Sequence, residues 1–181
     1  MKRWLAFGSV ALSASAAIAA QYSGYFAAFA LGKATTTILI AVWAALGWRK
    51  WRRAYGGWVL IALLFCLLGD VLLLEESRFV GGLAAFLVAH LLFCVAFGRV
   101  AGFRKDWRPL LWLLAIALPY YGWLWPHLGA LALPVGVYMG VIVLMAWQAW
   151  ALQLNAWPAS RIGVAASLFV FSDAVIALHK F

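Results

Sequence analysis

The chain has 181 residues, of which 68% are hydrophobic and only 10% are charged. A soluble domain carries charge on about a quarter of its residues, so this composition excludes an ordinary water-soluble fold and requires membrane lipid around most of the chain. The net charge of +9 does not indicate a nucleic-acid partner, because the basic residues stand in short clusters between long apolar runs.

About seven apolar runs follow one another along the chain, and about 20 apolar residues suffice to cross a bilayer as a helix. The first run, Trp4 to Ala20, follows the basic residues Lys2 and Arg3. It resembles a signal peptide, but we expect an uncleaved first helix. The other runs are about Gly24 or Lys33 to Trp48, Gly57 to Leu74, Phe79 to Gly98, Pro109 to Trp125, Leu128 to Gln148, and Ile162 to Leu178. The sequence therefore predicts an all-α, polytopic transmembrane helix bundle that forms a single domain over residues 1–181.

The basic residues predict how this bundle is oriented. With the N-terminus in the cytoplasm, eleven of the fourteen Lys and Arg residues fall on the cytoplasmic side, as the positive-inside rule requires. They are Lys2, Arg3, Arg49, Lys50, Arg52, Arg53, Arg99, Arg104, Lys105, Arg108 and Arg161. We predict an integral membrane protein of a bacterial inner membrane with a cytoplasmic N-terminus.

Two aspartates lie inside predicted spans, where an unpaired charge costs several kcal/mol. Asp70 and Asp173 stand about four and five residues from the outer ends of the third and seventh spans. At about 1.5 Å per residue both lie roughly 6–8 Å below those ends, so they meet at one depth if the two spans are neighbours. Lys33, at the outer start of the second span, is the nearest candidate counter-charge. The other interpretations are a protonated aspartate that bonds two helices and a lysine that extends to the headgroups.

The remaining polar candidates lie deeper. His90 stands eleven residues into the fourth span, near the bilayer midplane, and Gly82, Phe86, His90 and Cys94 recur every four residues on one face. His90 is either functional or a structural hydrogen-bonding residue. Tyr138 offers a hydroxyl group at the middle of the sixth span. A single mid-membrane histidine gives little support to a metal site, and we predict neither a metal nor another cofactor.

An ordered set of these residues forms a pattern. It runs through Leu68-Gly69-Asp70-Val71-Leu72-Leu73, then Phe79 to His90 as F-x2-G-x3-F-x3-H, then Phe169, Ser172, Asp173, Ile176 and Lys180-Phe181. With Lys33, and with Tyr138 and Met145-Ala146, this set resembles the YhhN family, whose members include the lysoplasmalogenases. The resemblance extends from about Lys33 to the last residue. The family often has proline where this chain has Ala34, and it typically has eight spans.

The resemblance implies hydrolysis of the vinyl-ether bond of a lysoplasmalogen to a fatty aldehyde and glycerophosphocholine or glycerophosphoethanolamine. This reaction begins with protonation of the β-carbon and passes through an oxocarbenium ion, so it requires a protonated carboxyl group and a carboxylate. We predict that Asp70 and Asp173 are this acid/base pair, without assigning the acid, and that His90 orients water or a carboxyl group. The expected substrate contacts are Lys33 to the phosphate, Tyr138 as a hydrogen-bond donor, Phe86 and Ser172.

Two other functions remain open at this point. A non-enzymatic transporter or lipid-binding protein would use the buried Asp and His residues to bind protons or a cationic solute, although the sequence has no internal repeat and no pair of broken helices. A hydrolase of an ester or amide lipid would be a third class, but no G-x-S-x-G motif is present. The predicted partners are a lysophospholipid substrate and membrane lipid, with no nucleic acid. The oligomeric state is not predicted.

Overall fold

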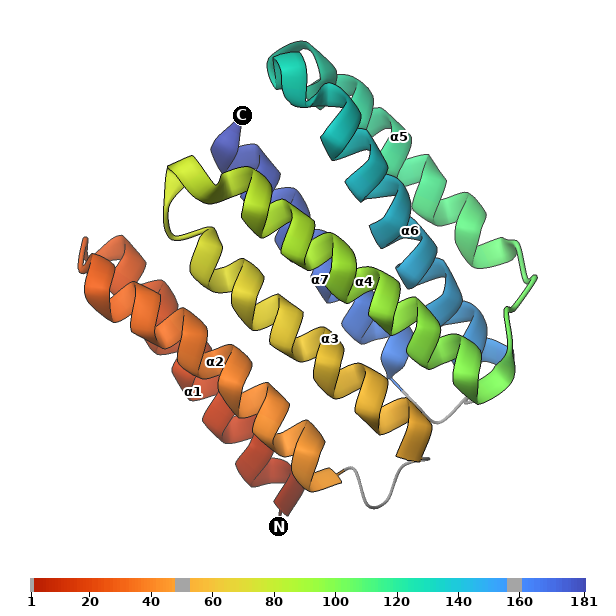
Figure 1. The fold of residues 1–181 in the computed structure, drawn as a ribbon, viewed down its shortest axis with the longest axis horizontal. Coiled ribbons are helices and arrows are strands. Elements are labelled where there is room, and N and C mark those ends of the chain that lie inside the picture. Colours follow the sequence, from red (N-terminus) through yellow and green to blue (C-terminus); the bar gives the residue numbers. More distant parts are fainter. Residues whose placement is uncertain (1, 48–52, 156–160) are drawn as a thin grey trace. The chain divides into compact units, whose positions relative to one another are not determined.

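Each apolar run folds into a helix, because in a bilayer the backbone N–H and C=O groups must pair within their own segment. The structure is a computed structural model that describes residues 2–47, 53–155 and 161–181. Figure 1 shows the α-helices of these segments, among which there is no strand. They are α1 (Lys2–Tyr22), α2 (Phe26–Gly47), α3 (Arg53–Leu72), α4 (Phe79–Ala101), α5 (Arg108–Leu128), α6 (Ala132–Asn155) and α7 (Ile162–Lys180), with the 3₁₀ turns η2 (Glu76–Arg78) and η3 (Gly129–Leu131). The predicted all-α fold is confirmed.

The predicted number of spans needs a correction. Over the described segments, five stretches are long and apolar enough to cross a membrane: Trp4–Tyr22, Phe26–Gly47, Tyr55–Leu72, Glu76–Ala101 and Arg108–Asn155. The last stretch contains two helices, α5 and α6, which follow one another through η3 and pack against each other, so it accounts for two of the helices. The apolar part of α7, Ile162–Leu178, is shorter than the others. The predicted count of about seven is therefore too high by this criterion.

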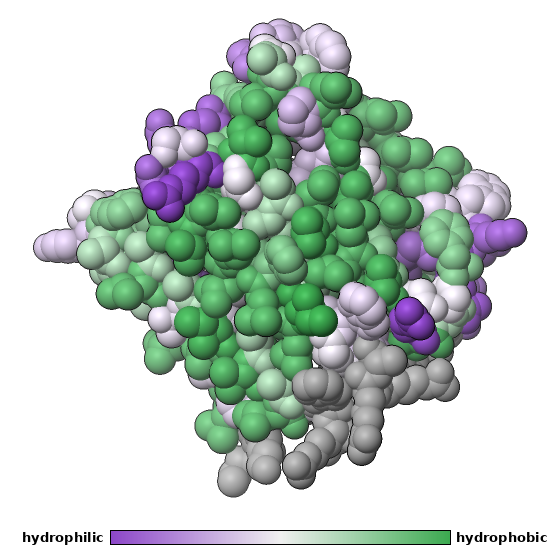
Figure 2. All heavy atoms as spheres, in the orientation of Figure 1, coloured by the Kyte–Doolittle hydropathy of each residue, from purple (hydrophilic) through white to green (hydrophobic). Residues whose placement is uncertain are grey.

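Apolar side chains cover much of the surface of the helices. Figure 2 shows one face of the molecule, on which hydrophobic residues predominate. None of the described residues of α2 is buried, and Leu118 of α5 and Phe171 of α7 are 60% and 69% exposed. Water-soluble monomers rarely expose continuous apolar patches larger than a few hundred Å². The chain is an integral membrane protein whose outer surface faces lipid.

The chain packs as two compact units, residues 1–92 and 93–181, which divide inside α4. The expectation of a single domain stays a prediction. In the first unit α2 packs against α1 and against α3. The α1–α2 contact is close, since a Cβ atom on Gly32 would lie 2.8 Å from Cβ of Ala17. Thr36 adds a hydrogen bond from its hydroxyl to Ser13 Oγ, 2.9 Å away. Small residues and hydroxyl groups are the usual means by which membrane helices associate.

Two glycines bring α3 close to the first turns of α4. A Cβ atom on Gly69 would lie 2.5 Å from Cδ2 of Phe86, and one on Gly82 would lie 2.7 Å from Cγ of Leu73. Neither position accepts a side chain without a shift of the neighbour. Because Gly69 precedes Asp70, this contact also fixes the position of Asp70.

In the second unit α6 packs against both α5 and α7. Trp150 of α6 contacts both neighbouring helices. Its Nε1 donates to Ser167 Oγ of α7 at 2.9 Å, and its ring lies edge-on to that of Trp112 of α5, with the ring centroids 5.6 Å apart. The buried residues of α6 include Tyr138, Ile142, Met145, Ala149 and Leu152. Their spacing of three or four residues places them on one side of the helix.

The loop between α4 and α5 is held against α6 by side-chain hydrogen bonds. The backbone N–H of Arg104 donates to Oε1 of Gln148 at 2.9 Å, and Nε2 of Gln148 donates to the Arg104 carbonyl at 3.0 Å. Nε1 of Trp147 donates to the Asp106 carbonyl at 2.5 Å. The backbone of this loop is therefore fixed against α6 about two turns before the helix ends.

Three of the basic residues that predict the orientation stand in a segment that the structure does not describe. Arg49, Lys50 and Arg52, like Trp48 at the end of the second predicted run, lie outside the described residues. The predicted orientation stays a prediction.

Candidate active site

Asp70 lies two residues before the end of α3 and receives two partners from α2. Nζ of Lys33 lies 3.3 Å from its Oδ1, and the Thr37 hydroxyl donates to its Oδ2 at 2.5 Å. Lys33 and Thr37 are four residues apart, so successive turns of α2 present both side chains on one face. The Asp70 side chain is only 12% exposed. A buried carboxylate is tolerated where a counter-charge and hydrogen bonds engage its oxygens, and both oxygens of Asp70 are engaged.

Phe86 and His90 lie on α4 within the same unit. Their side chains are 5% and 0% exposed, and their rings stack with centroids 6.4 Å apart. Phe86 also fills the space above Gly69 of α3. The Phe86 ring therefore packs against α3 next to Asp70, and the His90 ring lies one turn further along α4.

Asp173 lies seven residues before the end of α7 in the second unit. The hydroxyl of Tyr138, on the buried side of α6, donates to its Oδ2. One residue further on, the Ala174 carbonyl accepts a hydrogen bond of 2.7 Å from the hydroxyl of Tyr120 on α5. Two tyrosines from α5 and α6 thus fix this turn of α7 and the direction of the Asp173 carboxyl group.

Ser172 is separated from this cluster although it precedes Asp173 in the sequence. Its side chain is exposed, because adjacent residues of a helix point about 100° apart. It makes no side-chain hydrogen bond to another residue of the described segments. Its predicted contact with substrate stays a prediction.

The structure brings together some of the residues predicted from the sequence. Lys33 and Asp70 form an ion pair, as expected for the nearest counter-charge, and Tyr138 is bonded to Asp173. These two clusters belong to different units, so the expectation that the two aspartates act together stays a prediction. Within residues 2–47, 53–155 and 161–181, no group of three His, Cys, Asp or Glu side chains is placed to hold a metal ion.

Two partners in these clusters were not predicted. Thr37 could have been found from the sequence, because it stands four residues after Lys33 and therefore on the same face of the helix. Tyr120 has no comparable signal. Its bond to Ala174 depends on how α5 packs near α7, and the local sequence contains nothing that specifies this contact.

The fold and the two clusters define an α-helical integral membrane protein that holds two carboxyl groups within its helices. The model of the YhhN family matches residues 28–181, and this chain belongs to the YhhN family. The matched range contains Lys33, Asp70, Tyr138 and Asp173.

Curated relatives carry enzyme names. The chain is 39% identical to Lysoplasmalogenase TMEM86A of Bos taurus over 132 residues, which are 68% of this chain and 53% of the relative. It is 36% identical to Lysoplasmalogenase TMEM86B of Rattus norvegicus over 138 residues, 72% and 54% of the two chains. It is 33% identical to Lysoplasmalogenase of Mycobacterium tuberculosis over 133 residues, 68% and 50%. The chain thus spans about half the length of the curated relatives it matches. No solved structure matches it.

Proposed function

We propose that this chain hydrolyses the vinyl-ether bond of lysoplasmalogens, releasing a fatty aldehyde and glycerophosphocholine or glycerophosphoethanolamine. Membership of the YhhN family and the names of the curated relatives support this reaction. The structural observation that carries the proposal is the Asp70 carboxyl group, which is held inside apolar helices by Lys33 and Thr37. Such a costly group is expected at a functional site.

The reaction requires two carboxyl groups in different protonation states. A carboxylic acid gives its proton to the β-carbon of the vinyl ether, which leaves an oxocarbenium ion at the α-carbon. Water adds to the α-carbon and loses a proton to a carboxylate, so the proton count is restored. When the resulting hemiacetal breaks its bond to the glycerol oxygen, the carboxyl group that took the water proton gives a proton to that oxygen, and the other carboxylate removes the proton of the hemiacetal hydroxyl. Both carboxyl groups thus regain their starting states, and the oxygen of the water becomes the aldehyde oxygen. General acid–base catalysis of this kind contributes about 10²–10⁴-fold to a rate.

The partners of the two aspartates suggest which one is the acid. The Lys33 ammonium and the Thr37 hydroxyl both stabilise a negative charge on Asp70. We assign Asp70 as the carboxylate that faces the oxocarbenium ion and accepts the proton of water. Asp173 is then the acid. The uncharged Tyr138 hydroxyl, which donates to its Oδ2, fixes the direction of this carboxyl group.

The substrate contacts follow from the same clusters. The Lys33 ammonium has three donors and keeps a quarter of its side chain exposed, so it can bind Asp70 and still reach a phosphate oxygen. Phe86 and Ser172 contact the lipid chain or the glycerol, and His90 orients water or a carboxyl group. The reaction takes place in a bacterial inner membrane, with the N-terminus of the chain in the cytoplasm.

The purified full chain in detergent tests this function directly. Given a vinyl-ether lysolipid and the acyl lysolipid with the same headgroup, it is expected to release aldehyde from the first and no fatty acid from the second. Release of fatty acid would instead show an ester hydrolase. Failure to release aldehyde, combined with proton-coupled uptake of a cationic solute in vesicles, would show the transporter.

A further inference from the structure

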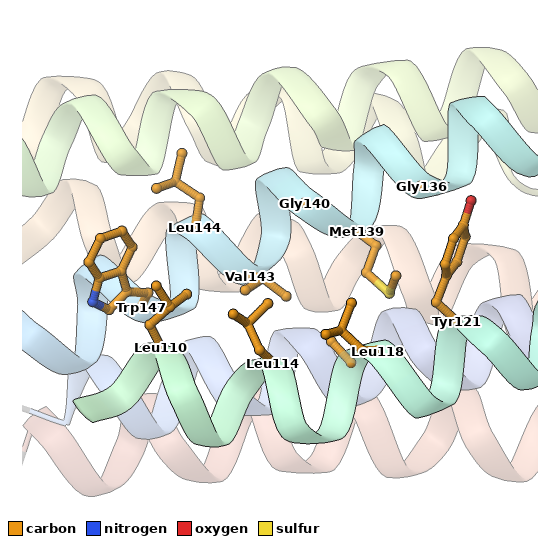
Figure 3. Close-up of a pocket in the computed structure, with 11 residues that line it drawn as sticks. Leu110, Leu114, Leu118, Tyr121, Gly136, Met139, Gly140, Val143, Leu144 and Trp147 are labelled. Carbon is orange, nitrogen blue, oxygen red and sulfur yellow. The ribbon is translucent and has the colours of Figure 1, made fainter. Parts of the chain in front are cut away.

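A groove of about 510 Å³ runs between α5 and α6 in the second unit. Figure 3 shows Leu110, Leu114 and Leu118 of α5 facing Val143 and Trp147 of α6 across it. Nearly all the side chains that line it are apolar. The groove extends along α5 from Leu110 to Tyr121, which is about 16 Å at 1.5 Å per residue.

Glycines leave the α6 side of the groove open. A Cβ atom on Gly140 would have no neighbour within 4 Å, whereas one on Gly136 would lie 2.6 Å from the Tyr121 hydroxyl. That hydroxyl donates to the Ala132 carbonyl at 2.7 Å and is fixed there. Tyr121 therefore closes one end of the groove. At its middle the groove is wide, because Gly140 places no side chain there.

The other end of the groove lies beside a basic loop. Trp147 lines this end. Its ring centroid lies 5.3 Å from that of Phe103, and its Nε1 donates a hydrogen bond to the Asp106 carbonyl. The same loop carries Arg104 and Lys105, and Arg108 begins α5 two residues before Leu110. Nε of Arg104 is buried and has no hydrogen-bond partner among the residues the structure describes.

The one acidic residue of the loop does not cancel this positive charge. Asp106 accepts hydrogen bonds from Nδ2 of Asn155 at 3.0 Å and from the backbone N–H of Arg108 at 3.1 Å. Against its single carboxylate stand Arg104, Lys105 and Arg108. The loop beside the Trp147 end of the groove thus carries net positive charge, while the groove itself is lined by apolar side chains.

We propose that this groove binds one acyl chain of an anionic phospholipid from the surrounding bilayer, with the lipid phosphate at Arg104, Lys105 and Arg108. An apolar groove on a lipid-facing surface takes up hydrocarbon, and the charge at its mouth selects the headgroup. Each basic residue near an anionic lipid surface strengthens binding by about fivefold. Trp147 at the mouth has the amphipathic ring favoured at the headgroup level.

A lipid in this position is not a substrate for the proposed reaction. The bond that the reaction breaks lies beside the headgroup, which the loop holds at the Trp147 end. Tyr138, the partner of Asp173, is nine residues away along α6, which is about 13 Å. The groove therefore binds a lipid that stabilises the α5–α6 pair and is not consumed.

Lipid retention by the purified full chain tests the proposal without reference to hydrolysis. The chain is incubated in detergent micelles with phosphatidylglycerol or with phosphatidylcholine of the same acyl chains, and lipid retained after gel filtration is quantified by mass spectrometry. We expect at least about tenfold more phosphatidylglycerol than phosphatidylcholine per chain, since three cations contribute, together with a higher melting temperature in phosphatidylglycerol. Equal retention of the two lipids would overturn the proposal and indicate ordinary boundary lipid.

Substitutions in the groove and in the basic loop test the contribution of each to lipid binding separately. Gly140→Leu fills the groove and is expected to abolish the preference, whereas Gly98→Leu, at another helical position with open space around it, leaves the preference unchanged. The double change Lys105→Gln with Arg108→Gln removes two exposed cations and is expected to lower phosphatidylglycerol retention by roughly an order of magnitude. Equal loss in Gly140→Leu and Gly98→Leu would contradict a site in the groove, and full retention in the double variant would contradict a phosphate contact.

Discussion

Asp70 shows how two residues of α2 can decide the chemistry of a residue of α3. Its carboxyl group is paired with Lys33 on one oxygen and with Thr37 on the other. The lysine supplies charge and the threonine supplies direction, since a hydroxyl bonded to one oxygen restricts rotation of the carboxyl plane. In the proposed reaction this restriction keeps a lone pair of Asp70 directed at water.

Thr37→Val is a test of this role, because valine has nearly the shape of threonine and lacks the donor. Hydrogen bonds to charged groups contribute about 1.5–3 kcal/mol, so kcat for aldehyde release is expected to fall at least about tenfold, with a smaller change in KM. Thr36→Val is the matched control. Thr36 bonds Ser13 and the Gly32 carbonyl, and its loss should leave kcat near that of the wild type. Equal rates for Thr37→Val and wild type would show that Thr37 does not position Asp70.

At the scale of the elements, glycines set how closely the helices approach. Gly69 allows the ring of Phe86 to lie against the α3 backbone, and Gly32 does the same for Ala17 at the α1–α2 contact. Such contacts cannot be read from hydrophobic periodicity, because a glycine in an apolar run gives no sign of which neighbour it faces.

Gly69→Ala should therefore destabilise the chain, although alanine is the better helix former. Overpacking of a close contact costs about 1–3 kcal/mol, which exceeds the gain of about 1 kcal/mol in helix propensity. Gly122→Ala is the control, since its Cβ would meet open space, and it should be neutral or stabilising. The measurement is unfolding by denaturant in detergent. A Gly69→Ala variant as stable as Gly122→Ala would contradict the close α3–α4 contact.

The α4–α5 loop contains a carboxyl group, Asp106, whose contribution to the stability of the fold should depend on pH. The Asn155 side chain, followed by the Arg108 backbone N–H and the Arg108 charge, holds the pKa of Asp106 below its ordinary value. A carboxyl group with a lowered pKa in the folded state stabilises the fold above its ordinary pKa, and this stabilisation is lost as the pH falls through the folded-state pKa. The difference in melting temperature between wild type and Asn155→Ala should be constant from neutral pH to about pH 4 and should shrink below that. A difference that does not change in acid would show that the hydrogen bond does not depend on the charge of Asp106.

For the whole molecule, composition was sufficient to predict an all-helical membrane fold. The contacts that form the candidate site depend on how the helices pack and could be found only from the structure. The apolar runs predicted the helices α1 to α7 because backbone pairing in lipid leaves few alternatives. They did not predict the 3₁₀ turns η2 and η3. The intramembrane charges identified Asp70, Asp173 and Lys33, since each is costly there. The contacts from Thr37, Tyr120 and Phe86 arise between helices and required the structure.

The predicted orientation can be tested on the full chain by labelling from one side of the membrane. Lys105→Cys in the α4–α5 loop and Ser77→Cys in η2 place thiols at opposite ends of α4. In intact cells a membrane-impermeant maleimide should label Ser77→Cys and should label Lys105→Cys only after the cells are opened. The native Cys66 is buried and should contribute little background. The reverse labelling pattern would place the N-terminus outside.

The most direct measurement of the proposed function is the initial rate of aldehyde release from a vinyl-ether lysolipid by the wild type, Asp70→Asn and Asp173→Asn. If Asp70 is the carboxylate and Asp173 the acid, each amide variant keeps its fold and loses at least about 10²-fold in kcat. A monodisperse gel-filtration peak and an unchanged helical spectrum confirm folding. Substantial aldehyde release by either folded variant would contradict the account.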